Sequence, residues 1–149
     1  MSVLHRFRLA LPKRWRSLPQ NLRGGIKGEN AAARYLFWRG YILIDRNFTS
    51  GKNEIDIIAK KKNTYIFCEV KTRTLDYRGL QTQNRPAAAV TADKQRHLIA
   101  AATVFAERHM REGCDFRFDV IEVYLSKSLR VTHIHHIKNA FVRETFQKR

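Results

Sequence analysis

Apolar side chains recur along this chain in two different periods, and the changes between them divide it into predicted elements. A spacing of three to four residues predicts helices at 28–39 and 91–110. Thr91 is a suitable N-cap for the second helix. Gly40 and Gly113 are suitable C-terminal ends for the first and the second helix, respectively. An alternation of two residues predicts strands instead, at 41–48, 54–60, 65–72, 116–125 and 130–137.

The order of these elements, α-βββ-α-ββ, predicts an α/β domain with a central mixed β-sheet flanked by helices. Short polar links at 49–53 and 61–64 favour hairpins between the first three strands. The polar segment 74–85 predicts a loop. We therefore expect a single domain over residues 25–149, preceded by a flexible basic arm over residues 1–24 that ends at a glycine pair.

The composition limits the partners of this domain. The 149 residues include 29 basic and 13 acidic ones, so the formal net charge is +16. Residues 1–24 carry six of the bases and no acid, and the remainder is still strongly basic. A charge of this sign favours a polyanion, either nucleic acid or an anionic membrane surface.

The chain has no apolar run of about 20 residues, so no transmembrane segment is expected. It also has no apolar core typical of a secretory signal. Two cysteines, Cys68 and Cys114, do not suggest a disulfide framework. Because Cys68 replaces an aliphatic residue in a strand pattern, we expect a buried thiol in a protein of the reducing cytoplasm.

Charged residues interrupt two of the predicted strands at every second position. Glu54 and Asp56 share one face of their strand, and Glu69 and Lys71 share one face of the next. A four-residue turn that pairs residue 60 with residue 65 would place Asp56 opposite Glu69 and Glu54 opposite Lys71. A slip of one residue would move the two pairs to opposite faces, so the hypothesis requires this register.

Two interpretations fit this pattern. Asp56 and Glu69 could hold one Mg²⁺ or Mn²⁺ ion through oxygen, with Lys71 placed to bind a phosphate or orient the attacking water. Alternatively, the residues could form a surface hairpin with alternating solvated charges, whose ion pairs contribute little. The spacing alone leaves both interpretations open.

Several motifs together resemble a known family. GENAAARYLFWRGY, RNF, NEIDIIA, FCEVKTRT and RFDVIEV occur in the order and spacing of the YraN-type bacterial family. The arrangement of Asp56 and Glu69-Val70-Lys71 resembles the D…(D/E)-x-K core of the restriction-endonuclease-like nuclease superfamily, which includes archaeal Holliday-junction resolvases. The resemblance implies that fold. It also implies metal ligation by Asp56, Glu69 and the Val70 carbonyl, catalysis by Lys71, and a role for the helical Glu29 in the same site.

Other polar residues have a functional and a structural interpretation. Thr72 and Arg73 continue the motif strand and could contact phosphate, Arg73 with the better geometry. Lys94 could reach phosphate from the second helix or could be part of a solvated helix face. We expect a structural role for Asp119.

Three histidines, at 133, 135 and 136, suggest a zinc site only weakly, because no cysteine spacing or HExxH pattern accompanies them. Alternation in a terminal strand explains them.

The function expected from the sequence is Mg²⁺-dependent hydrolysis of phosphodiesters in structured or branched DNA. A homodimer would follow if two strands are cut together. One alternative is a nucleic-acid-binding module of a DNA-processing complex with little or no activity. Another is a protein attached to a membrane surface through residues 3–18, which form a basic amphipathic segment interrupted by Pro12.

Overall fold

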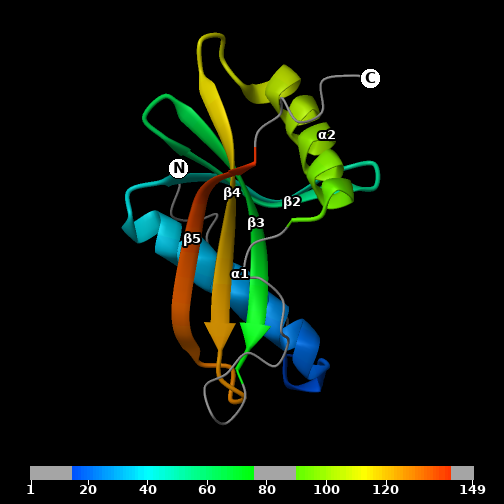
Figure 1. Cartoon of the computed structure of the whole chain (residues 1–149), viewed down its shortest axis with the longest axis vertical. Helices are drawn as coiled ribbons and strands as arrows, with labels where there is room; N and C mark the ends of the chain where they lie inside the picture. The colour runs from blue at the N-terminus through cyan, green and yellow to red at the C-terminus, as the bar shows by residue number, and fades with distance from the viewer. Residues whose placement is uncertain (1–14, 76–89, 142–149) are drawn as a thin grey trace.

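The secondary structure follows the predicted order. A computed structural model describes residues 15–75 and 90–141 (Figure 1). The elements are a 3-10 turn η2 (Trp15–Ser17), α1 (Gln20–Trp38), β1 (Ile42–Ser50), β2 (Asn53–Lys61), β3 (Thr64–Thr74), α2 (Ala92–His109), β4 (Asp115–Leu125) and β5 (Val131–Phe141).

The strands form one five-stranded sheet in the order β1-β2-β3-β4-β5. Hairpins join β1 to β2, β2 to β3 and β4 to β5 in antiparallel pairs. The pairing of β3 with β4 is parallel, because α2 lies between them in sequence and carries the chain back to the same end of the sheet. The predicted mixed sheet in an α/β fold is therefore confirmed.

The two helices cover opposite faces of the sheet (Figure 1). Under α1 the core contains Ala32, Ala33 and Leu36, and under α2 it contains Leu98 and Phe105. The Thr91 side chain accepts a hydrogen bond from the Lys94 amide and caps α2, as predicted. Gly40 follows the C-cap of α1 with a φ of 79°, which explains the glycine there. The helix α2 ends at His109, before the expected Gly113, whose φ of 76° belongs to the turn that leads into β4.

The buried thiol expected at position 68 is present. Cys68 is fully buried in the core under α1, where burial raises the pKa of its thiol well above the usual value. Neither helix of the described residues is long and apolar enough to cross a bilayer.

The predicted start of the first helix is wrong. The helix α1 begins at Gln20, eight residues before the expected start, and it runs through Gly24 and Gly25. Gly24 is buried, and a Cβ added there would make only ordinary van der Waals contact with Leu125 and Leu129, so packing against these residues holds this turn in the helix despite its glycines. Residues 20–24 thus belong to α1 rather than to an arm. Residues 1–14, which include most of the proposed membrane segment, lie outside the described residues, as do residues 76–85 of the predicted loop.

Candidate active site

The predicted hairpin register is confirmed from Ile57 to Lys61, and the expected pairs of Asp56 with Glu69 and of Glu54 with Lys71 lie beyond this ladder. In the ladder of β2 with β3, Lys60 pairs with Tyr65 and Ile57 pairs with Cys68. Just beyond the last pair, the Asp56 carboxylate accepts a hydrogen bond of 2.7 Å from the Val70 amide. Asp56 thereby joins the two strands where their backbone pairing ends, and it lies beside Glu69.

The carboxyl groups of Asp56 and Glu69 interact directly. Burial, and then the negative charge of Asp56, raise the pKa of Glu69 to about 7. Burial also raises the pKa of Asp56, although the Val70 amide and a hydrogen bond with Glu69 act against that shift. Two partly buried carboxylates this close together favour sharing a proton or binding a cation.

Two lysines approach this pair from different elements. The ammonium of Lys94, on α2, lies 3.2 Å from Oε2 of Glu69. Lys71 lies two residues after Glu69 on β3, and its positive charge lowers the pKa of Glu69. The structure thus brings Asp56, Glu69, Lys71 and Lys94 together, and in this state Lys94 is paired with a carboxylate.

The predicted helical glutamate also belongs to this region. Glu29 on α1 interacts with Asp56, since burial and then the Asp56 charge raise the pKa of Glu29. Arg46 on β1 lies 3.8 Å from Glu29 and donates a 2.9 Å hydrogen bond to Asn30. The sequence analysis missed Arg46, although the RNF motif contains it, because an arginine in a strand pattern does not show which helix it faces.

Gly28 lets α1 contact the motif strand. A Cβ at this position would collide with the hydroxyl group of Thr72 on β3. Thr72 therefore faces α1, on the opposite side of the strand from Glu69, Lys71 and Arg73. It lines an open cleft with Val70 and Thr74 of β3 and with Gln20, Asn21, Gly24, Gly25 and Glu29 of α1. The nucleic-acid contact expected of Thr72 would have to be made in that cleft.

Arg73 is engaged by a second buried acid that the sequence analysis did not single out. Its guanidinium lies 3.8 Å from Glu122, which is fully buried on β4. Tyr124 donates a 3.1 Å hydrogen bond to the same carboxylate, and His135 lies 3.3 Å from it. Because Glu122 pairs in register with Lys71, this cluster adjoins the carboxylate pair. The sequence does contain a signal for Glu122, because an acid within the otherwise apolar end of RFDVIEV is unusual for a buried strand.

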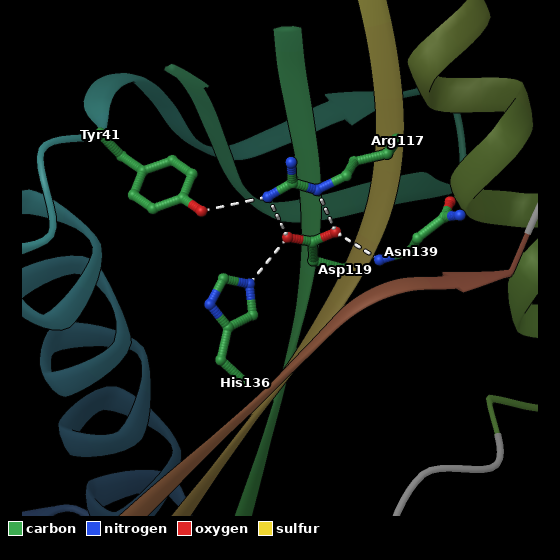
Figure 2. A network of polar contacts seen from close by, with 5 residues as sticks. All are labelled: Tyr41, Arg117, Asp119, His136 and Asn139. Carbon is green, nitrogen blue, oxygen red and sulfur yellow. Dashed lines mark hydrogen bonds and ion pairs between the residues drawn. The ribbon is translucent and has the colours of Figure 1, made fainter.

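Asp119 has the structural role that was expected of it (Figure 2). Arg117 contacts both of its oxygens at 2.9 and 3.0 Å, His136 contacts one at 2.7 Å, and the Asn139 amide donates to the other at 2.9 Å. Burial alone would raise the pKa of Asp119, but these hydrogen bonds outweigh it and lower the pKa. The network ties β4 to β5 and, through Tyr41, to the start of β1.

The donor atoms around Asp56 and Glu69 fit a hard divalent cation. Carboxylate and carbonyl oxygens are the ligands that Mg²⁺ prefers, and Oε2 of Glu69 is buried with the Lys94 ammonium as the cation now beside it. Over residues 15–75 and 90–141 no three His, Cys, Asp or Glu side chains surround a common point. An ion held here would therefore depend on two carboxylates, a backbone carbonyl and water or substrate oxygen.

The histidines do not form a zinc site among the residues described. His135 contacts Glu122 and His136 contacts Asp119, and these acids project from opposite faces of β4. Their side chains thus serve two separate polar clusters.

The fold and this site define a small basic α/β protein whose mixed sheet carries a pair of interacting carboxylates with lysines beside them. The chain belongs to the family described as "Uncharacterised protein family UPF0102", whose model matches residues 28–123. This confirms the resemblance to the YraN-type family. The matched part includes Glu29, Asp56, Glu69, Lys71 and Lys94.

Several curated proteins are similar over most of their length. A UPF0102 protein of Caldicellulosiruptor saccharolyticus is 44% identical over 117 residues, covering 78% of this chain and 95% of that protein. A UPF0102 protein of Chloroherpeton thalassium is 45% identical over 111 residues, covering 74% and 81%. A third, UPF0102 protein Cphamn1_0017 of Chlorobium phaeobacteroides, is 37% identical over 129 residues, covering 84% and 97%. The similarity thus covers the strands that carry the site.

Proposed function

We propose that this protein is a Mg²⁺-dependent endonuclease that hydrolyses phosphodiester bonds in structured or branched DNA. The observation that carries the proposal is the hydrogen bond that holds the Asp56 carboxylate against Val70, next to Glu69, where burial raises the pKa of both carboxyl groups. A buried pair of this kind is costly unless a cation compensates it. Perturbed carboxylates beside lysines are typical of catalytic sites.

Each residue has a role that follows from its position. Asp56, Glu69 and the Val70 carbonyl would hold the ion, which supplies Lewis-acid activation of water and phosphate when bound. The Val70 amide fixes the Asp56 carboxylate through their hydrogen bond. Lys71 would donate a hydrogen bond to the scissile phosphate, where a fixed positive charge stabilises developing negative charge. Glu29 would orient water from the α1 side, with Arg46 holding it in place.

The charge of the protein supports a nucleic-acid substrate. A formal net charge of +16 gives sequence-independent attraction to phosphates. No base-reading motif accompanies it, so recognition by DNA structure is the better fit. Arg73, Thr72 and Lys94 are the proposed phosphate contacts near the site. Arg73 and Lys94 would exchange their present carboxylate partners for phosphate when DNA binds.

A second function is favoured by one observation. The ammonium of Lys94 already lies against Glu69 and compensates part of the pair's charge without a metal ion. In a nucleic-acid-binding module that does not hydrolyse DNA, this ion pair would be permanent. Replacement of Lys94 by alanine distinguishes the two functions. It should tighten Mg²⁺ binding if the carboxylates are a metal site, and it should leave Mg²⁺ binding absent in the inert module.

The proposal is tested by incubating the purified protein with forks, flaps, four-way junctions, duplexes and single strands, with and without Mg²⁺ or Mn²⁺. We expect cleavage of at least one branched substrate only when the metal is present. Asp56→Ala and Lys71→Ala should abolish cutting while retaining DNA binding. Tight binding with no cleavage of any substrate in either metal would favour the inert module instead.

A further inference from the structure

A groove along the edge of the α1-side core, between α1 and β5, is lined only by apolar, neutral polar and basic residues. It consists of two adjoining hollows between α1 and β5, of about 370 and 400 Å³. Both hollows include Ala31, Arg34 and Val131, so they form one continuous surface, here called the α1–β5 groove. The charged residues that line it are Lys27, Arg34, Arg39 and Arg130.

Trp38 stands at one end of this groove and is 81% exposed. Its described aromatic neighbour is Phe37, and the rings meet edge to face at 5.6 Å and 78° rather than stacking. Val131 across the groove is 47% exposed. A tryptophan this exposed, beside other exposed apolar side chains, is typical of a binding surface.

Cations and aromatic rings continue around the end of α1. The Arg39 guanidinium lies 4.5 Å from the centre of the Tyr35 ring. Lys61 donates a 2.7 Å hydrogen bond to the Arg39 carbonyl, and its ammonium lies 4.8 Å from the centre of the Tyr41 ring. Two arginines, Arg34 and Arg39, thus line the same hollow as the exposed indole.

We propose that the α1–β5 groove binds a single-stranded segment of nucleic acid, with Trp38 stacking on a base and Arg34 and Arg39 contacting phosphates. Single strands are bound by aromatic platforms set in a basic groove, which matches this surface. A protein interface would be depleted of charge at its centre. A bilayer would need the apolar side chains on a flat or convex face rather than along a hollow.

This surface is distinct from the carboxylate site. Trp38 lies nine residues after Glu29 on α1, about 14 Å along the helix axis. One helix would therefore carry a residue of the candidate active site and, further along, a contact for an unpaired arm of the substrate. The inference does not require the proposed hydrolysis, because it concerns binding alone.

Tryptophan fluorescence tests the proposal directly. The sequence has two tryptophans, so a Trp15→Phe variant leaves Trp38 as the single emitter. Titration with a short oligothymidylate in metal-free buffer should quench this emission as the complex forms, measured in parallel by anisotropy of a labelled oligonucleotide. Asp56→Ala added to this variant should give the same quenching, so the result does not depend on whether the protein cuts DNA.

Matched substitutions separate stacking from charge. Trp38→Ala should weaken oligothymidylate binding by roughly 5- to 100-fold, and Trp38→Phe should retain most of the affinity. Arg34→Ala should weaken binding and reduce the salt dependence by about one charge. Leu22→Ala changes a residue of α1 that is also exposed, at 52%, but lies outside the groove, and should have no effect.

Four results would overturn the proposal. The first is an absence of oligonucleotide binding, and the second is binding that neither quenches Trp38 nor weakens in Trp38→Ala. The third is stronger quenching by anionic phospholipid vesicles than by the oligonucleotide. The fourth is a fluorescence change with protein concentration alone. The third would indicate a membrane surface and the fourth self-association through this groove. A protein that quenches as expected but cuts no DNA would retain this inference and lose the proposed hydrolysis.

Discussion

The Asp56 carboxylate accepts a 2.7 Å hydrogen bond from the backbone amide of Val70, just beyond the last backbone pair of β2 and β3. Burial, and to a lesser degree the charge of Glu54, raise the pKa of the same carboxylate and so destabilise its charged form. One side chain thus closes the hairpin and also carries the charge that a cation would neutralise.

Two substitutions of Asp56 should separate these roles. Asp56→Asn keeps an acceptor for the Val70 amide and removes the charge, so we expect its free energy of unfolding to equal or exceed that of the wild type. Asp56→Ala leaves the amide unpaired and should lower the free energy of unfolding by about 1–3 kcal/mol. Urea denaturation without metal measures both. Equal destabilisation by the two substitutions would show that the hydrogen bond contributes nothing.

Glu69 should make the metal-free protein less stable as the pH rises. Its pKa is about 7 in the folded state, against 4.5 as the ordinary value, so the folded state binds more protons between these pH values. Stability conferred by the protonated form is full below about pH 4.5 and is lost as the pH rises through 7. The loss is on the order of 1–3 kcal/mol.

Glu69→Gln should remove this pH dependence. Above pH 7, added Mg²⁺ should raise the free energy of unfolding of the wild type but not that of Glu69→Gln. Chemical denaturation at pH 5, 6, 7 and 8 gives the profile. An unchanged profile in Glu69→Gln would rule out Glu69 as the titrating group.

Gly28 should be required for the contact between α1 and β3. A Cβ there would collide with Thr72, and we expect Gly28→Ala to lower the free energy of unfolding by about 1–3 kcal/mol. Gly25 is in the same helix with nothing within 4 Å of the added atom, so Gly25→Ala should instead stabilise by about 0.5–1 kcal/mol.

Thr72→Ala removes the side-chain atoms that the new methyl group would meet, and it should restore part of the loss in a double variant with Gly28→Ala. If the loss of unfolding free energy in the double variant equals the sum of the losses in the two single variants, the strain does not come from contact with Thr72.

Asp119 should contribute most to the stability of the network in Figure 2. Asp119→Ala would leave Arg117 and the buried His136 without their acceptor and should cost about 3–5 kcal/mol. Tyr41→Phe removes only one hydrogen bond to Arg117 and should cost about 1 kcal/mol. Asp93→Ala, which breaks a fully exposed ion pair on α2, is the control and should change little. Thermal unfolding would show whether this ranking holds.

The strands and their register could be predicted from the sequence because local information specifies them. The four-residue link from Lys61 to Thr64 fixes which residues pair, and that pairing places Asp56 beside Glu69. The start of α1 could not be predicted, because two glycines resemble a break unless the burial of Gly24 beside Leu125 of β4 is known. Contacts between distant elements, such as Arg46 with Glu29, depend on how α1 crosses the sheet, which no local pattern records.

The polar clusters show the same limit. The role of Asp119 was expected from a single acid among apolar residues, but its partners come from β4 and β5. Lys94 was considered as a phosphate contact, and its position against Glu69 became visible only once α2 was packed on the sheet.

The proposed function requires Asp56, Glu69 and Lys71 to form one metal-dependent hydrolytic site. The most direct test is the cleavage rate of the best branched substrate at saturating Mg²⁺, measured for the wild type, Asp56→Asn and Lys71→Ala purified identically. Cleavage by the wild type should require the metal and fall by about 10²-fold or more in each variant. Cleavage at the wild-type rate by either variant, or none by the wild type in Mg²⁺ or Mn²⁺, would contradict the claim.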